Sequence, residues 1–119
     1  MAKFVEHTLR SSFEGPYVMF EISVKMNFYE DEIGTKWRLD IVLVEKDKIW
    51  DDLFRNENWG RSFEANKGTV SLEIHVPIHK DDMNTEPGLE EVFAKLTLKA
   101  VDGNFPTVEA KTDIIKVDV

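Results

Sequence analysis

The side chains in this chain of 119 residues that could do chemistry are mainly carboxylates, and they gather in two polar stretches. One stretch spans residues 45–58 and the other spans residues 79–91. Ca²⁺ is held by six to eight oxygen ligands, many of them from Asp and Glu side chains. If the two stretches meet in the fold, the candidate metal ligands are Asp47, Asp51, Asp52, Asp81, Asp82 and Glu86.

The same stretches are candidates for binding a protein. The net charge is −8, from 23 acidic and 15 basic residues, and the two stretches hold most of this excess. Such a balance disfavours nucleic acids and anionic membranes, so we expect a basic protein partner. The alternative is that the charge serves only solubility. The candidate partner-binding residues are Asp51, Asp52, Asp81, Asp82, Glu90 and Glu91.

Sequence patterns typical of catalysis are missing. The chain has no cysteine, no Gly-x-Ser-x-Gly motif and no glycine-rich phosphate loop. Its carboxylates fall in predicted loops, whereas a general acid or base usually needs burial to tune its pKa. His75 and His79 fall on the outer face of one predicted strand, about 13 Å apart, which is too far for one metal ion. We therefore expect a non-catalytic domain and interpret both histidines as surface residues.

The elements that would position the loops are strands. From Val18 to Phe28, apolar and polar residues alternate, which is typical of a strand with one face in a core. The alternation returns over residues 37–43, 69–78 and 92–101. Trp37 in an inward position is similar to the core tryptophan of immunoglobulin-like sandwiches, although the cysteine pair and the tyrosine corner of immunoglobulin domains are missing.

Weaker patterns fill the remaining segments. Residues 3–9 and 59–64 favour short strands, and a phase shift in the last strand indicates a bulge near Asp113. Pro77 predicts that its strand lies at a sheet edge, because proline cannot donate a ladder hydrogen bond. Short helical turns are predicted at two places. One is the apolar stripe Ile49, Trp50, Leu53 and Phe54, and the other is Pro87 to Glu91.

These elements predict one all-β domain over residues 1–119. The expected architecture is an antiparallel, immunoglobulin-like β-sandwich of about seven strands with at most one or two short helical turns. An open barrel is the alternative. The expected core comprises Val18, Phe20, Ile22, Val24, Met26, Trp37, Leu39, Ile41, Leu43, Leu72, Ile74, Val76, Leu96 and Leu98.

Antiparallel connections alternate between the two ends of a sandwich, which brings the acidic stretches together. The connections 11–16, 45–58 and 79–91 are expected at one end, and 29–35, 65–68 and 102–106 at the other. We therefore predict a binding domain that engages a basic protein through an acidic end. The alternative is a calcium-binding β-sandwich with carboxylate ligands from both stretches.

The sequence also predicts where the protein works. The lack of cysteines fits a reducing compartment. The first residues lack the apolar run of a signal peptide, and no apolar segment is long enough to cross a bilayer. We expect a cytoplasmic protein without membrane contacts and, apart from a possible Ca²⁺, without a cofactor.

Overall fold

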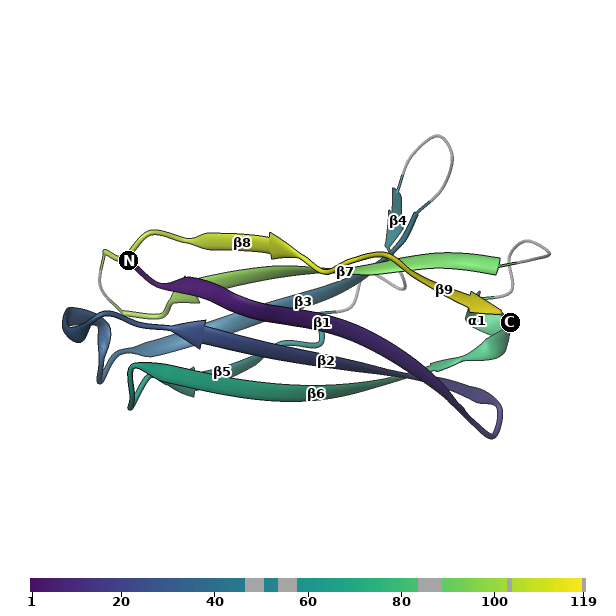
Figure 1. Ribbon diagram of the computed structural model, residues 1–119, viewed down its shortest axis with the longest axis horizontal. Coiled ribbons are helices and arrows are strands. Elements are labelled where there is room, and N and C mark those ends of the chain that lie inside the picture. The colour runs from purple at the N-terminus through teal and green to yellow at the C-terminus, as the bar shows by residue number, and fades with distance from the viewer. Residues whose placement is uncertain (47–50, 54–57, 84–88, 103, 119) are drawn as a thin grey trace.

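The computed structural model describes residues 1–46, 51–53, 58–83, 89–102 and 104–118. Within these ranges the chain forms nine strands in two antiparallel sheets, one short α-helix and one 3₁₀ turn (Figure 1). The predicted all-β sandwich is therefore confirmed.

The first sheet has the strand order β1-β2-β6. Its strands are β1 (Lys3–Glu14), β2 (Tyr17–Asn27) and β6 (Thr69–His79). β2 lies in the middle and buries its apolar even positions, as the alternation predicted. β6 is an edge strand, which explains how it accommodates Pro77.

β1 is longer than predicted. Gly15 adopts a positive φ of 58° and makes the turn with Pro16 alone. Ser11 to Glu14, which were predicted to form part of the turn, therefore continue the pairing with β2 up to Glu14 opposite Tyr17. Glycine suits this position because it has no Cβ to clash at positive φ.

The second sheet is built around β3 (Lys36–Lys46) and β7 (Leu89–Ala100). The free side of β3 pairs with two short strands, β4 (Asp51–Leu53) and β5 (Arg61–Glu64). The free side of β7 pairs with β8 (Val108–Lys111) and β9 (Ile115–Asp118). The edge strand predicted near residues 59–64 is thus confirmed.

The break between β8 and β9 falls at the phase shift predicted near Asp113. Thr112 sits in this break with its side chain buried. Its backbone N–H donates to the Ala94 carbonyl at 3.0 Å, and its Oγ1 accepts the Ala94 N–H at 2.9 Å. The threonine hydroxyl therefore replaces the backbone carbonyl that a regular strand would have offered.

The core lies between the two sheets. Every predicted core residue is buried except Leu72, which is half-buried and packs against the core. At one end the Trp37 ring stacks on Phe105 with 5.7 Å between centroids and lies 5.2 Å from Phe28. At the other end Met83 of α1 (Lys80–Met83) is fully buried.

The helix predicted from the stripe in residues 45–58 is wrong where the structure describes this segment. Residues 51–53 form β4, which pairs with the end of β3 through Val44 opposite Leu53. A helix here would leave the edge backbone groups of β3 without these ladder partners. Ile49, Trp50 and Phe54 lie outside the described residues.

The helical turn predicted at Pro87 to Glu91 is also wrong in its described part. Residues 89–91 begin β7, where Glu90 pairs with Val117 and Glu91 with Lys116. Pairing with the C-terminal strand, which is distant in sequence, outweighs the local preference of Pro87 to start a helix. The short helix forms earlier, at α1.

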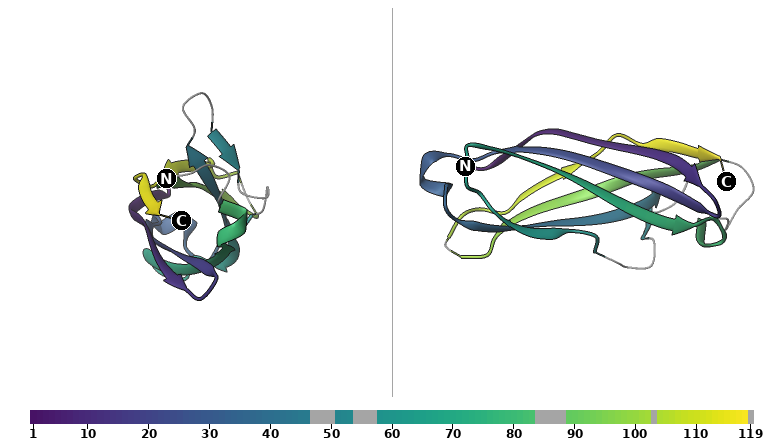
Figure 2. Two further views of the ribbon diagram at one scale, coloured as in Figure 1. Left: turned by 90° about the vertical axis from the view of Figure 1, so that its right-hand side faces the viewer. Right: turned by 90° about the horizontal axis from the view of Figure 1, so that it is seen from below.

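Of the described parts of the connections, 11–16 and the start of 79–91 lie together at one end as predicted, whereas β4 in 45–58 branches away from the sandwich. The β1–β2 turn and α1 lie at one end, and the 3₁₀ turn η1 (Glu30–Glu32) lies at the other (Figures 1 and 2). Among the described residues, no helix is long and apolar enough to cross a membrane.

Candidate functional site

The predicted acidic residues separate into three places. Asp81 and Asp82 lie in α1, at the tip of the sandwich, and Asp81 is exposed. Asp51 and Asp52 lie in β4, where only the backbone is described. Glu90 and Glu91 lie in β7, and Asp47 and Glu86 fall outside the described residues.

Glu90 differs most from its predicted role. It was expected in an exposed loop, but its side chain is buried at the end of the second sheet, opposite the buried Val117. Glu91 on the next position is half-buried. Residues in this strand alternate between the inner and outer faces, which turns Glu90 inward.

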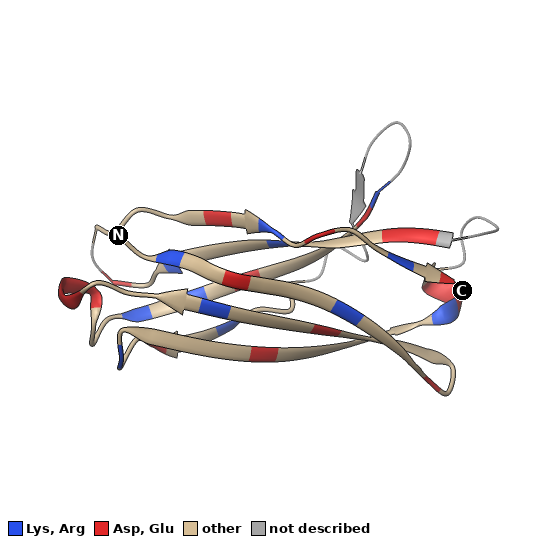
Figure 3. Cartoon of the chain, in the orientation of Figure 1, with Lys and Arg blue, Asp and Glu red and all other residues tan. Residues whose placement is uncertain are grey.

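β4 and α1 do not lie side by side. In Figure 1, β4 branches away from the sandwich, whereas α1 caps its end, and the end-on view in Figure 2 shows the same separation. Figure 3 marks acidic residues in α1 and in the neighbouring part of β7. A calcium site shared by the two acidic stretches stays a prediction, because Asp47 and Glu86 lie outside the described residues and only the backbone of Asp51 and Asp52 is described.

The α1 end of the sandwich also exposes aromatic rings. We call Phe13, Glu14, Tyr17, Lys80 and Asp81 the α1-end surface. Phe13 is 56% and Tyr17 43% exposed, and the Asp81 side chain is 90% exposed. Lys80 places its Nζ over the Phe13 ring, 5.1 Å from the centroid. The surface therefore combines exposed carboxylates with a ring that already contacts a cation.

His79 lies between Tyr17 and Asp81 of this surface and contacts both. Its ring meets Tyr17 edge-on with 5.3 Å between centroids. Its Nδ1 accepts the Asp81 N–H at 3.1 Å and lies 3.6 Å from the Asp81 carboxylate. His79 therefore links β2 to the start of α1 and fixes where the helix leaves the sheet.

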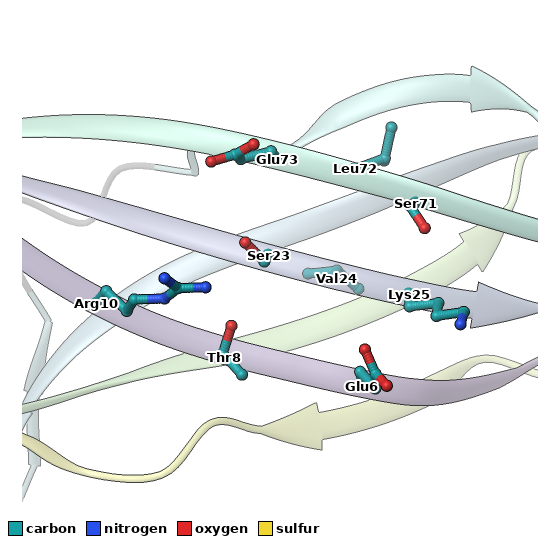
Figure 4. Close-up of a pocket in the computed structure, with 9 residues that line it drawn as sticks. All are labelled: Glu6, Thr8, Arg10, Ser23, Val24, Lys25, Ser71, Leu72 and Glu73. Carbon is teal, nitrogen blue, oxygen red and sulfur yellow. The ribbon is translucent and has the colours of Figure 1, made fainter.

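A second feature covers the outer face of the β1-β2-β6 sheet. Thr8, Ser23 and Glu73 form one row across the three strands. The positions on either side of this row include longer charged residues. The small hydroxyl side chains of Thr8 and Ser23 lie between those residues and leave a shallow depression (Figure 4). Its lining residues are Glu6, Thr8, Arg10, Ser23, Val24, Lys25, Ser71, Leu72 and Glu73.

Three potential metal ligands gather beside this depression. Glu21 on β2 lies directly opposite His75 on β6, and Glu73 precedes His75 by two positions on the same face. One ligand atom from each of the three residues lies within 4.8 Å of the other two. The sequence interpretation compared His75 only with His79 and so missed this cluster.

Asp40 forms a charged cluster on the outer face of the other sheet. Its Oδ1 accepts hydrogen bonds from Arg38 Nε and Asn58 Nδ2, both at 2.7 Å, and its Oδ2 lies 3.6 Å from Lys99 Nζ. Burial alone would raise the pKa of Asp40. The bonds from Asn58 and Arg38, with the charges of Arg38 and Lys99, outweigh burial and lower that pKa.

This cluster anchors the chain where it returns from the first acidic stretch. Asn58 Oδ1 accepts the N–H groups of Ile41 at 3.0 Å and Gly60 at 2.9 Å, and Trp59 donates to the Ile41 carbonyl at 2.8 Å. A Cβ at Gly60 would lie 1.7 Å from the Leu39 carbonyl, so only glycine fits here. The role of Asp40 is therefore to position this segment against β3.

Comparison with models of known protein families and with curated proteins finds no match for this chain. The candidate surfaces are thus defined by geometry alone: the α1-end surface, and the cluster of Glu21, Glu73 and His75.

Proposed function

We propose that this chain is a non-catalytic binding domain whose α1-end surface engages a basic segment of a partner protein. The observation that carries the proposal is the contact of Lys80 with the exposed Phe13 ring, beside the exposed Asp81 carboxylate. A lysine or arginine of a partner finds the same two kinds of group here, an aromatic face and an exposed carboxylate.

The composition of this surface suits a protein interface. Aromatic residues are enriched at interfaces because they bury a large area at a small cost in conformational entropy. The net charge of −8 raises the encounter rate with a basic partner and lowers it for acidic ones. Asp51 and Asp52 of β4 belong to the proposal as further acidic contacts. The lack of cysteines is the ground for placing this function in the cytoplasm.

The opposite end of the sandwich provides a matched control surface. It also exposes an aromatic ring, Tyr29, next to the exposed acids Glu30 and Asp31 of η1. A nonspecific attraction between a basic ligand and an acidic protein would use both ends alike. The proposal requires that the ligand prefer the α1 end.

The test uses a synthetic peptide of alternating arginine and glycine as the probe, with a glutamate–glycine peptide as its counterpart. Binding is followed by amide chemical-shift changes and by titration calorimetry at two salt concentrations. We expect shifts at Phe13, Tyr17 and Asp81, and an affinity that falls as salt rises. We expect the Phe13→Ala/Tyr17→Ala variant to lose affinity at least fivefold.

Two further variants decide between the ends. Charge reversal of Asp51, Asp52, Asp81 and Asp82 should weaken binding without unfolding the domain, which far-ultraviolet circular dichroism checks. The Tyr29→Ala/Asp31→Asn variant should bind the arginine peptide like the unchanged protein. Equal losses at both ends, or full affinity after the charge reversal, would contradict the proposal and leave the charge as a solubility device.

A further inference from the structure

We propose that Glu21, Glu73 and His75 bind one divalent transition-metal ion, with Zn²⁺ as the best match to the donors. The site lies on the outer face of the β1-β2-β6 sheet, away from the α1-end surface, and does not depend on the function proposed above.

The backbone register brings the three ligands together. Glu21 and His75 are directly paired across β2 and β6, and His75 Nδ1 lies 3.7 Å from Glu21 Oε1. Glu73 reaches the imidazole from its own strand, with Oε1 3.6 Å from Nε2. Side chains two positions apart on a strand share one face, so this arrangement needs no irregular backbone.

Each carboxylate lies near a different imidazole nitrogen, Glu21 near Nδ1 and Glu73 near Nε2, at a spacing close to that between two ligands of one ion. Zn²⁺ binds histidine nitrogen and carboxylate oxygen at about 2.0–2.2 Å, which sets neighbouring ligand atoms about 3.3–3.6 Å apart in a tetrahedron. A single imidazole nitrogen faces the ion, so one carboxylate must turn toward the nitrogen that binds. The side chains of Glu21 and Glu73 are 39% and 59% exposed, and water-exposed rotamers allow this turn. Water would fill the remaining position.

The donor set favours a transition metal over the hard cations. Ca²⁺ needs six to eight oxygens and Mg²⁺ keeps most of its water, whereas an imidazole nitrogen suits zinc, copper and nickel. Two carboxylates and a neutral imidazole balance the charge of a divalent ion. Arg10, which lies opposite Glu21 on β1 and lines the depression, carries a positive charge that opposes metal binding and weakens the site.

The experiment titrates the metal-free full chain with Zn²⁺ in a buffer that does not bind metal. Calorimetry measures the stoichiometry and affinity, and the histidine ring signals in ¹H–¹⁵N spectra identify the ligand. We expect one saturable site, with the His75 ring shifting and the His79 ring unchanged. His75→Gln should lower the affinity at least tenfold, and Glu21→Gln or Glu73→Gln should lower it several-fold.

Matched variants make the result decisive. His79→Gln alters a half-buried histidine on the same strand, and Glu109→Gln removes an exposed acid from the other sheet; neither should change the affinity. Arg10→Gln should raise it two- to fivefold, because it removes the opposing charge. Equal losses in His75→Gln and His79→Gln, or weak non-saturable uptake in every variant, would overturn the proposal. The Phe13→Ala/Tyr17→Ala variant should bind Zn²⁺ normally even if it loses the arginine peptide.

Discussion

His75 and Glu21 face each other across neighbouring strands, with the imidazole Nδ1 3.7 Å from the Glu21 carboxylate. The other imidazole nitrogen lies 3.6 Å from Glu73, so the ring stands between two carboxylates. All three side chains are in contact with water, which screens their attraction. The cluster therefore contributes little to folding.

We predict that His75→Gln changes the free energy of unfolding of the metal-free protein by less than about 1 kcal/mol, because exposed ion pairs contribute about that much or less. Urea unfolding at neutral pH in the presence of a chelator measures this value. A loss of several kcal/mol would show that the cluster holds the two strands together and that its arrangement has a structural cause.

Asp40 offers a contrasting case, in which charge does stabilise the fold. Asp40→Asn removes the negative charge that accepts bonds from Arg38 and Asn58. We predict a loss of about 1–2 kcal/mol at pH 7, since hydrogen bonds to charged groups are stronger than neutral ones. Asp31→Asn, at an exposed position in η1, should cost less than about 0.5 kcal/mol.

The effect of Asp40 should depend on pH in one direction. The pKa of Asp40 is lower in the folded protein than the ordinary aspartate value of 3.8. Its contribution is therefore fully present above the unfolded-state pKa and is lost as the pH falls through the folded-state pKa. The stability difference between the unchanged protein and Asp40→Asn should be constant near neutral pH and shrink below about pH 4. A difference that grows on acidification would contradict the lowered pKa.

The long strands β2, β3, β6 and β7 were predictable because each carries its own alternation, and Val18 to Phe28 is the clearest case. β4 could not be predicted in this way, because Ile49, Trp50, Leu53 and Phe54 have helical spacing. Residues 51–53 form a strand because they pair with the edge of β3. Tertiary pairing overrides local periodicity at such an edge. Glu90 was misplaced for the same reason, because its pairing with Val117 is distant in sequence.

The cluster of Glu21, Glu73 and His75 shows a second limit. The sequence places Glu21 on the outer face of one strand, and Glu73 with His75 on the outer face of another. It does not say that these strands are neighbours, because β3, β4 and β5 separate β2 from β6 along the chain. Spacing within one strand can be read from sequence, but a site built across two strands also needs their register.

Glu32 is a buried acid in an otherwise exposed turn, and its role can be tested directly. Its Oε2 accepts the Ala2 N–H at 2.9 Å and its Oε1 accepts the Tyr29 N–H at 2.8 Å. We predict that Glu32→Ala destabilises the protein by about 2–4 kcal/mol, because each donor left without a partner costs about 1–3 kcal/mol. Glu30→Ala in the same turn is the control and should be nearly neutral in urea unfolding. Equal stability of the two variants would contradict this role.

The predicted calcium site can be separated from the proposed zinc site by working in the His75→Gln background. If carboxylates of residues 45–58 and 79–91 hold Ca²⁺, the ion binds the folded state and raises the melting temperature. At 100 times its dissociation constant it would add roughly 2.7 kcal/mol to the stability. Mg²⁺ should do less, since it gives up its water reluctantly and needs stricter geometry.

One melting curve in chelator and one in millimolar Ca²⁺, at fixed ionic strength, measure the effect. Charge reversal of Asp51, Asp52, Asp81 and Asp82 should abolish any shift, because it replaces four of the six predicted ligands. Identical curves would exclude a calcium site of useful affinity. A shift that Mg²⁺ or NaCl reproduces in full would show that cations only screen the repulsion among these carboxylates, because a specific site distinguishes ions by their coordination and screening does not.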